Sequence, residues 1–423
     1  MSRKQIRKGY VALLGGVSSQ FAPARAFTSK LAAGISDLVL AISSDSTDNE
    51  NIEHTFLTVA NRLAPAYPAY LCQVQTFSDP SQTYAVNTNG FSGSFGEVLG
   101  STLFEDTFNR ADGSLGTTTS HGDTWAANTW TISGNKALAA ASGNLVSSAS
   151  VATDNLVAEA VFTALASGNY RIEALYNASD FGVFVQWNLT GATLFVKTGA
   201  GTVNLASVSI ATTAGTDYTA RLIVKGLWVG VNINGYTCGA YLTPTQKAAL
   251  GGQVYFAGPA STGVFDRVSV KTLTNTRTLK VYNGSVAGSA ISYHDTRIAL
   301  MLPERPDCWM IALGHNNDGT DTADQYVARM VSYVADVRGT YSGLTPIVCT
   351  ENARLDAGAA SAAARFAALR AAWSGQRWGF IDIEAPFTAL GGSLSSYLAG
   401  DLLHPNAAGE ALWSTTESNH FGF

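Results

Sequence analysis

Hydrophobic and polar positions near the start of the chain predict a strand, a helix and a second strand. Residues 37–43 (DLVLAIS) form a short apolar run that ends in a Ser-Asp-Ser turn, which is typical of a buried strand leading into a loop. Residues 54–63 carry apolar side chains at helical spacing, and Pro65 predicts the end of that helix. Residues 69–76 predict the second strand.

The same alternation returns after about residue 275. Each apolar run of strand length is followed by a longer segment of helical pattern, and Pro303 closes the first of these helices. Alternating strands and helices predict an α/β fold, with a parallel sheet covered by helices on both faces. Strands are predicted over 279–282, 308–313, 346–350 and 378–383, and helices over 289–302, 322–338, 357–373 and 406–416.

Between these regions, from about residue 101 to the 270s, the chain shows no convincing helical period. Short alternating segments separated by turn residues, with a hairpin signal at Asn234-Gly235, predict an all-β sandwich. The two ends of a sandwich can lie close together, so such a domain can be inserted into an α/β domain. Its strands are predicted over 156–163, 170–176, 181–187, 194–197, 218–224, 229–233, 253–256 and 267–271.

Composition and charge exclude several classes of protein. Hydrophobic residues make up 46% of the chain and charged residues 13%, which argues against a disordered protein. The formal net charge is −5 and the basic residues are dispersed, so no nucleic-acid-binding footprint is visible. No apolar run approaches the ~20 residues of a membrane-spanning helix. Four widely separated cysteines without a CxxC motif favour buried free thiols over disulfides or a zinc site, namely Cys72, Cys238, Cys308 and Cys349.

The N-terminus allows two interpretations. A basic stretch at 2–8, an apolar stretch at 10–17 and Ala-Arg-Ala at 24–26 imitate a secretory signal with a short apolar region, which would be cleaved near Ala26-Phe27. The alternative, which we favour, is an uncleaved segment over residues 1–34 that docks or anchors elsewhere.

Two polar motifs contain residue types suited to nucleophilic catalysis. Ser46 follows a predicted strand directly, where its hydroxyl would lie at the carboxyl edge of the sheet, the edge at which ligands of α/β proteins bind. In isolation such a serine is more often a helix N-cap. His404 lies three residues after Asp401, a spacing at which the carboxylate can orient the imidazole. The structural alternative is a capping aspartate beside an exposed histidine.

Two further motifs contain candidate donors to an oxyanion. Asn316 in Gly314-His315-Asn316 follows the predicted strand 308–313, and its side-chain amide can stabilise developing negative charge there. The structural alternative for this motif is an Asx turn after the strand. Gly288, at the end of the segment 283–288, can bring a backbone N–H close to a substrate because it lacks a Cβ. The alternative to Gly288 is the glycine-containing segment 87–93.

In this order the four motifs resemble the SGNH/GDSL hydrolases, a family of serine esterases named after Ser, Gly, Asn and His. The resemblance implies that Ser46 is the nucleophile and that His404 is the general base, oriented by Asp401. It also implies that Gly288 and Asn316 bind the oxyanion and that no metal or organic cofactor is needed. The implied fold is a flavodoxin-like parallel sheet flanked by helices.

The resemblance departs from the family pattern at three places. Ser44 stands where the family usually has glycine, and Asp48-Asn49-Glu50 replaces the glycine that usually follows shortly after the serine. Both changes affect the shape of the nucleophile loop. Asn317 precedes Asp318, so either Asn316 or Asn317 could face the oxyanion. The domains expected are an N-terminal anchoring or docking segment at 1–34, the first part of the hydrolase at 35–95, the inserted sandwich at 96–274 and the second part of the hydrolase at 275–423.

The ends of the inserted segment carry a second resemblance. Residues 108–113 (FNRADG) and 263–270 (GVFDRVSV) resemble concanavalin/laminin-G-type jelly rolls, which implies a lectin-like or carbohydrate-binding-like sandwich. In such folds Glu105, Asp106 and Asp266 could meet around a structural Ca²⁺, although solvated acids at strand ends are favoured. Aromatic residues of the insert could stack on sugars, but core packing is favoured and no binding residues are assigned.

These observations predict a serine esterase that hydrolyses ester groups, O-acetyl groups above all, on a polysaccharide or cell-surface glycan. The basic N-terminus suggests a bacteriophage tail component with other tail proteins as partners, located outside the cell or on the virion. A secreted bacterial esterase is the rival interpretation. A catalytically inactive glycan-binding or receptor-binding protein is the alternative from another class, and a lipase or thioesterase the alternative within the enzymes. The glycan, the acyl group and whether copies of the chain associate stay open.

Overall fold

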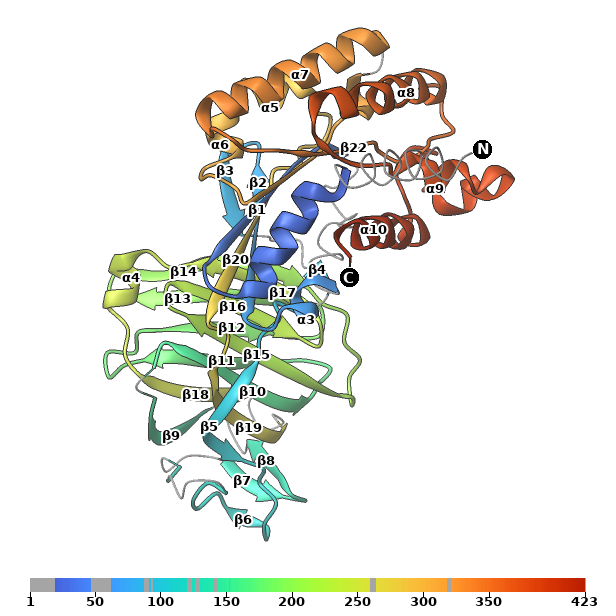
Figure 1. Cartoon of the computed structure of the whole chain (residues 1–423). Helices are drawn as coiled ribbons and strands as arrows, with labels where there is room; N and C mark the ends of the chain where they lie inside the picture. The colour runs from blue at the N-terminus through green and yellow to red at the C-terminus, as the bar shows by residue number, and fades with distance from the viewer. Residues whose placement is uncertain are drawn as a thin grey trace, which may run out of the picture. The chain divides into compact units, whose positions relative to one another are not determined.

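The computed structural model describes residues 20–46, 62–86, 91–92, 94–119, 124–125, 130–139, 143–151, 153–258, 264–317 and 321–422. The chain divides into two compact units, shown in Figure 1. One unit comprises Met1–Ala85 and Arg277–Phe423, and the other comprises Val86–Thr276.

The first unit is built on a seven-stranded sheet within the described residues, in the order β23-β22-β21-β1-β20-β2-β3. Neighbouring strands from β23 to β2 pair in parallel, with Leu40 of β1 opposite Val281 of β20 on one side and Cys308 of β21 on the other. The strands are β1 (Leu38–Ser44), β2 (Tyr70–Ser78), β3 (Thr83–Val86), β20 (Arg277–Asn283), β21 (Cys308–Ala312), β22 (Ile347–Cys349) and β23 (Gly379–Ile381).

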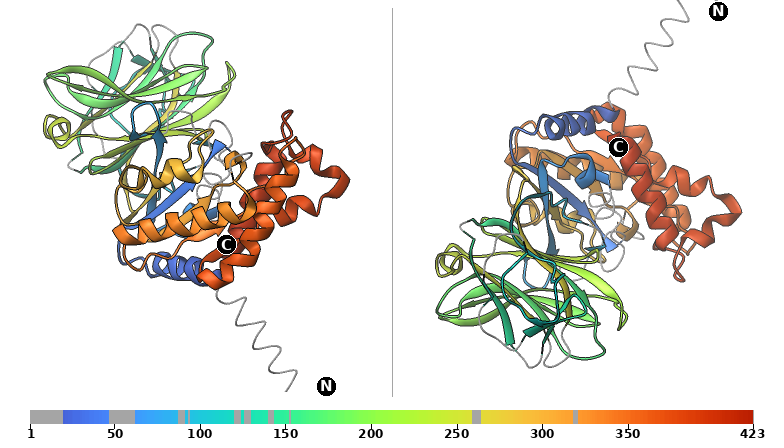
Figure 2. Two further views of the ribbon diagram at one scale, coloured as in Figure 1. Left: turned by 90° about the horizontal axis from the view of Figure 1, so that it is seen from above. Right: turned by 90° about the horizontal axis from the view of Figure 1, so that it is seen from below.

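Helices cover both faces of this sheet. Figures 1 and 2 show α7 and α8 on one face, and a helix over residues 20–33 beside α10 on the other. Phe27 of the first helix packs edge-on against Phe421 of α10, with ring centroids 6.3 Å apart. The helices are α3 (Ala64–Ala66), α5 (Ile291–Asp295), α6 (Ile298–Met301), η3 (His315–Asn317), α7 (Ala323–Thr340), α8 (Ala359–Gln376), α9 (Glu384–Thr388), η4 (Gly391–Tyr397) and α10 (Ala407–Phe421).

The sequence explains why the main elements form where they do. All seven residues of β1 are buried, as expected for a central strand covered on both faces. Helix α7 begins with a capping box, in which Thr322 accepts from the Gln325 N–H while the Gln325 side chain accepts from the Thr322 N–H. Asn406 caps α10 by accepting from Ala408 and Gly409. These caps fix the residues at which α7 and α10 begin.

The segment 289–302, predicted as one helix, consists of two short helices. Thr296 Oγ1 donates to the carbonyls of Ser292 and Tyr293, each at 3.0 Å, and Arg297 has non-helical dihedral angles. A threonine hydroxyl that bonds the backbone competes with helix continuation. The predicted helix over 54–63 lies almost entirely outside the described residues, which resume at 62.

The helix over 20–33 is the largest element of the first unit that the sequence pattern did not indicate. Ala24, Phe27 and Leu31 are buried along one side of it. The candidate cleavage position after Ala26 therefore falls inside a packed helix. Within the part of the chain that the structure describes, no helix is long and apolar enough to cross a membrane.

The described residues of the second unit form two antiparallel sheets that share one apolar core. One sheet has the order β4-β17-β16-β15-β10-β19-β8-β7-β6 with β5 paired to β19, and the other has the order β14-β13-β12-β11-β18-β9. The elements are β4 (Phe91–Ser92), β5 (Leu99–Asp106), β6 (Gly113–Ser114), β7 (Trp130–Ser133), β8 (Lys136–Ala139), β9 (Gly143–Ser150), β10 (Asn155–Thr163), β11 (Tyr170–Tyr176), β12 (Gly182–Trp187), β13 (Gly191–Thr198), β14 (Gly201–Ser209), β15 (Asp217–Lys225), β16 (Trp228–Ile233), β17 (Tyr236–Tyr241), α4 (Pro244–Ala248), β18 (Gln253–Gly258) and β19 (Val264–Leu273).

The mainly β character predicted for this region is confirmed, and so is the hairpin at Asn234-Gly235. These two residues join β16 to β17 with φ of +51° and +94°, the left-handed values that a type I′ turn requires. The two ends of the unit are tied together, because Asn275 accepts from the Val98 N–H and donates to the Gly96 carbonyl. These two hydrogen bonds hold the first and last segments of the unit next to each other.

Two of the three acids considered for Ca²⁺, Asp106 and Asp266, have other partners. Asp106 is buried and accepts from the Arg110 guanidinium and from Trp125 Nε1 at 2.7 Å each, while Asp266 lies 3.6 Å from Lys136 Nζ. Among the described residues no group of three His, Cys, Asp or Glu side chains is arranged to hold a metal ion. The aromatic residues Tyr170, Trp187 and Trp228 are core residues. The four cysteines are buried and form no disulfide.

Candidate active site

Ser46 lies two residues beyond the central strand β1, at the carboxyl edge of the parallel sheet. The chain before it is firmly held, because the Ser44 carbonyl accepts from the Val286 N–H at 3.1 Å and Asp45 is completely buried. Ser46 itself is partly exposed. The strand therefore presents this hydroxyl at the edge where α/β proteins bind their ligands.

The structure brings Ser46, His404 and Asp401 into one hydrogen-bonded line. His404 Nε2 lies 2.9 Å from Ser46 Oγ, and His404 Nδ1 lies 2.5 Å from Asp401 Oδ2. In this arrangement the Nδ1–H donates to the carboxylate, which leaves Nε2 to accept the serine proton. Ser46 and His404, which are 358 positions apart in the sequence, thus lie together with Asp401 in the geometry of a Ser-His-Asp triad.

The loop that carries Asp401 and His404 owes its shape to local hydrogen bonds. Asp401 Oδ1 accepts from the backbone N–H groups of Leu403 and His404, both at 3.0 Å. Leu402 takes a left-handed conformation with φ of +59°, which an L-residue seldom adopts without support. The His404 carbonyl also accepts from the Ala399 N–H at 2.7 Å. The aspartate therefore shapes the loop as well as orienting the imidazole.

These hydrogen bonds also determine the ionisation of Asp401. Partial burial acts to raise its pKa, but hydrogen bonds from the His404 side chain and from the backbone of Leu403 and His404 outweigh burial and lower the pKa to about 2. About half of the aspartate side chain is exposed. Asp401 is thus a carboxylate over the whole physiological pH range and can support an imidazolium.

Asn316 offers a donor that is not engaged elsewhere. It lies in η3, directly after β21, and its Nδ2 atom is buried with no hydrogen-bond partner among the described residues. The neighbouring Asn317 Nδ2 donates to Asp321 Oδ2 at 2.7 Å. A buried amide without a partner is costly unless a ligand or water uses it. This contrast favours Asn316 over Asn317 as the donor to an oxyanion.

Gly288 lies in the loop between β20 and α5, and its φ of +73° favours glycine. Its neighbours are hydrogen-bonded to the chain just before Ser46, because Val286 N–H and Ser289 Oγ both donate to the Ser44 carbonyl. Gly288 is exposed, and a Cβ added there would meet no atom within 4 Å. The alternative glycines at 90 and 93 lie outside the described residues.

Replacing Asn316 with alanine is expected to lower kcat for ester hydrolysis by about 10²- to 10³-fold, the usual cost of one oxyanion donor. KM should change much less, since the amide binds charge that develops in the transition state. Steady-state kinetics of Asn316→Ala beside the matched variant Asn317→Ala checks this. A larger kcat loss in Asn317→Ala would show that the assignment of the two asparagines is reversed.

A buried histidine beside the site makes stability dependent on pH. His294 is fully buried with its Nε2 2.9 Å from Ser289 Oγ, and desolvation lowers its pKa from 6.5 to about 3. Above pH 6.5 the group is neutral in both the folded and the unfolded chain. As the pH falls from 6.5 toward 3 only the unfolded chain takes up the proton, so stability is lost over that window.

This effect of His294 should amount to at most about 1.4 kcal/mol of unfolding free energy per pH unit. Denaturant unfolding at pH 7.5, 6.5, 5.5 and 4.5 measures it. A His294→Gln variant should show a shallower decline across this series. An identical decline in the variant would assign the acid sensitivity to other groups, such as His420, whose pKa burial lowers to about 4.

The sequence pattern did not single out Glu351 and Asn352, two fully buried residues beside the site. They follow β22, as Ser46 follows β1 and Asn316 follows β21. Polar residues directly after a predicted parallel strand were therefore an available signal, because the carboxyl ends of parallel strands lie at one edge.

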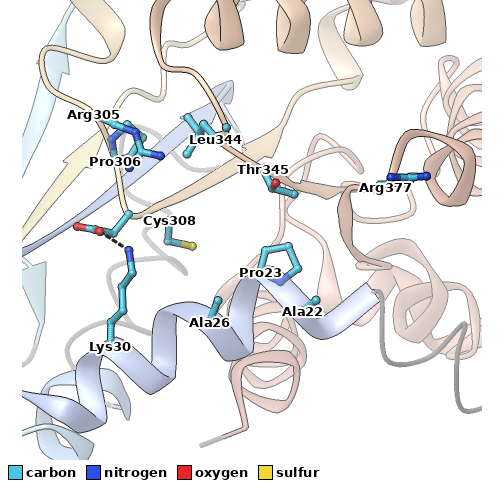
Figure 3. Close-up of a pocket in the computed structure, with 12 residues that line it drawn as sticks. Ala22, Pro23, Ala26, Lys30, Arg305, Pro306, Cys308, Leu344, Thr345 and Arg377 are labelled. Carbon is cyan, nitrogen blue, oxygen red and sulfur yellow. Dashed lines mark hydrogen bonds and ion pairs between the residues drawn. The ribbon is translucent and has the colours of Figure 1, made fainter.

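A cavity of about 620 Å³ lies at the opposite, amino-terminal edge of the same sheet (Figure 3). Its walls come from the helix over 20–33 and from the segments that lead into β21, β22 and β23. Figure 3 shows Lys30 on one side of it and Arg377 on the other. The Lys30 Nζ atom lies 2.6 Å from Asp307 Oδ1. The position of this cavity separates it from the edge that carries Ser46.

One known family matches part of the chain. The sequence profile of the GDSL-like Lipase/Acylhydrolase family matches residues 251–412, a range that includes Gly288, Asn316, Asp401 and His404 but not Ser46. The match starts inside the β-rich unit and covers most of the second part of the α/β unit. No curated protein matches the chain.

Among solved structures, a peptidoglycan O-acetylesterase is similar over 94% of both chains with 11% identity and a TM-score of 0.41. A catalytic mutant of an acetylxylan esterase from Geobacillus stearothermophilus covers 34% of this chain and 74% of its own, with 20% identity and a TM-score of 0.31. The carbohydrate-binding module CBM66 from Bacillus subtilis covers 36% of this chain and 96% of its own, with 12% identity and a TM-score of 0.29.

Proposed function

We propose that the protein is a serine esterase of the SGNH/GDSL type. The observation that carries the proposal is the hydrogen-bonded line from Ser46 Oγ through His404 to Asp401, with the buried Nδ2 of Asn316 left without a partner among the described residues. The family match at 251–412 supports it independently. The strand order β20-β1-β21-β22-β23 supports the flavodoxin-like arrangement expected of such enzymes.

In the proposed mechanism, Ser46 Oγ attacks the ester carbonyl while His404 Nε2 takes the serine proton. Asp401 stabilises the imidazolium that forms. The Asn316 amide and the backbone N–H groups of Ser46 and Gly288 bind the oxyanion of the tetrahedral intermediate. His404 then gives the proton to the departing alcohol, which leaves an acyl group on Ser46. Water, activated by the same histidine, hydrolyses this acyl-enzyme and restores the serine.

For the substrate we propose an O-acetylated polysaccharide or cell-surface glycan. The inserted β-sandwich supports this, because an ester-cleaving unit joined to a second compact unit can act on a large substrate. The fold alone does not define a ligand, so the substrate class rests on this combination. Location outside the cell or on a virion tail, with tail proteins as partners, is part of the same proposal, and a secreted bacterial enzyme is its rival.

The test is acetate release from O-acetylated xylan and O-acetylated peptidoglycan, each compared with its chemically deacetylated form. Wild type is expected to release acetate, and Ser46→Ala, shown to be folded by circular dichroism, is not. Wild-type protein that binds these glycans without releasing acetate would instead support the inactive glycan-binding alternative. Release only from a small chromogenic ester would retain the esterase and reject the proposed substrate class.

A further inference from the structure

Glu351 and Asn352 lie directly beyond β22, which pairs in parallel with β21. The strand β21 leads into Gly314, His315 and Asn316. Both Glu351 and Asn352 have no exposed surface. Burying a carboxylate and an amide together is unfavourable unless both are hydrogen-bonded, so their contacts should show what they contribute.

The Glu351 carboxylate holds the turn that carries Asn316. Its Oε2 atom accepts from the His315 backbone N–H at 2.6 Å, which is the amide immediately before Asn316. The same oxygen lies 3.0 Å from the place where a Cβ on Gly314 would stand, so the carboxylate packs directly against the turn. Glu351 therefore fixes the direction in which the Asn316 side chain leaves the backbone.

Asn352 connects this turn to the loop that carries His404. Its Nδ2 atom donates to the Leu403 carbonyl at 2.8 Å and to the Ala353 carbonyl at 3.1 Å. Its Oδ1 atom faces His315 Nε2 at 3.4 Å, where the imidazole can donate. Leu403 directly precedes His404, and the adjoining Leu402 carbonyl accepts from the Leu355 N–H at 2.9 Å. One buried amide thus contacts both loops.

We propose that Glu351 and Asn352 are positioning residues for the proposed esterase. Glu351 acts on the oxyanion donor Asn316 through the His315 backbone, and Asn352 keeps the His404 loop in register with that turn. The inference rests on the proposed function and extends it to two residues that touch neither the substrate nor the reacting atoms. A displacement of about 1 Å in a catalytic group can lower the rate about 10²-fold, so such bracing is functionally significant.

The first test separates positioning by Glu351 from general structural support. Glu351→Gln keeps a side-chain oxygen that can accept from His315 N–H, and its kcat is expected to stay within about threefold of wild type. Glu351→Leu removes the acceptor at similar volume, and kcat is expected to fall about 10- to 100-fold with little change in KM. If both variants lose kcat equally, the hydrogen bond to His315 does not explain the role of Glu351.

The decisive measurement is a double-mutant cycle. If Glu351 acts through Asn316, then Glu351→Leu should cost less than about threefold in kcat when Asn316 is already alanine. A full 10- to 100-fold loss in the Asn316→Ala background would overturn the inference for Glu351, because it would show an independent effect. Thermal unfolding of all four proteins identifies variants that are not folded.

Asn352 is tested by a substitution of the same shape, which also serves if Glu351→Leu does not fold. Asn352→Asp keeps the oxygen that faces His315 but removes the donor to the Leu403 carbonyl, so kcat is expected to fall at least about tenfold. The control is Thr350→Val, two residues back, which removes the hydroxyl that contacts the Glu384 N–H and Asp382. Equal kcat for Asn352→Asp and wild type would overturn the inference for Asn352.

Failure of this inference can be distinguished from failure of the proposed function. Absence of Ser46-dependent hydrolysis in the wild type would overturn the proposed function and this inference together. Ser46-dependent hydrolysis that is unaffected by Glu351→Leu and Asn352→Asp would overturn the positioning role alone. Loss of kcat in Thr350→Val as large as in Asn352→Asp would also overturn it, because any buried polar change near β22 would then have the same effect.

Discussion

Replacing Ser46 with alanine is expected to lower kcat/KM for a short-chain chromogenic ester by at least about 10⁴-fold. The hydroxyl that lies 2.9 Å from His404 Nε2 is the atom that would form the acyl-enzyme, and alanine leaves no substitute for it. KM for any residual hydrolysis should stay close to that of wild type, because the oxyanion donors remain. Steady-state assays with 4-nitrophenyl acetate measure both quantities.

The control for Ser46→Ala is Ser289→Ala, the other serine near a buried histidine. Ser289 Oγ lies 2.9 Å from His294 Nε2, but Ser289 is buried, unlike Ser46. The Ser289–His294 pair therefore matches the Ser46–His404 pair in its distance but not in its exposure. Activity that survives in Ser46→Ala and disappears in Ser289→Ala would show that Ser289, and not Ser46, is the nucleophile.

Replacing Asp401 with asparagine should lower kcat by about 10³- to 10⁴-fold without unfolding the loop. The asparagine oxygen can still accept from the backbone N–H groups of Leu403 and His404, so the loop geometry should persist. The new amide can no longer act as a negative partner for the imidazolium, and it favours the wrong tautomer of His404. The pH dependence of kcat/KM in both proteins provides the readout.

The Asp401 carboxylate has a pKa lowered to about 2, so its contribution in the wild type should be complete above pH 4. The usual pKa of an aspartate is 3.8. The stabilisation that the Asp401 carboxylate gives the loop is therefore lost only as the pH falls from 3.8 toward 2. Asp307→Asn is the matched control, since Asp307 also accepts a backbone N–H, that of Val39, at the other edge of the sheet. Similar kcat losses in both variants would point to sheet stability and not to the imidazole.

The elements that could be predicted from sequence were those with an apolar run of defined length. The run at 37–43 corresponds to β1 (Leu38–Ser44), and the strand predicted at 170–176 matches β11 (Tyr170–Tyr176). The helix over 20–33 was not indicated, because its basic and alanine-rich sequence also fits a leader peptide. Its burial depends on contact with residues such as Phe421, near the other end of the chain.

The order of motifs in the sequence indicated the candidate site residues, whereas the contacts between them are seen only in the structure. The contact between Ser46 and His404 depends on how β1 and the last loop meet, which no local pattern contains. The choice between Asn316 and Asn317 depends on Asp321, four residues after Asn317, which engages one amide and leaves the other. Glu351 and Asn352 were missed because buried polar residues have no periodic signature, and their role appears only through their hydrogen-bond partners.

The central claim is that Ser46 is the nucleophile, and covalent labelling tests it most directly. The protein would be treated with diethyl 4-nitrophenyl phosphate, a reagent that phosphorylates activated serines, and then analysed by intact-mass and peptide mass spectrometry. We expect a single diethylphosphoryl group on the peptide that contains Ser46, together with loss of esterase activity, and no such label in Ser46→Ala. Stoichiometric labelling and inactivation at another serine, with Ser46 unmodified, would contradict the account.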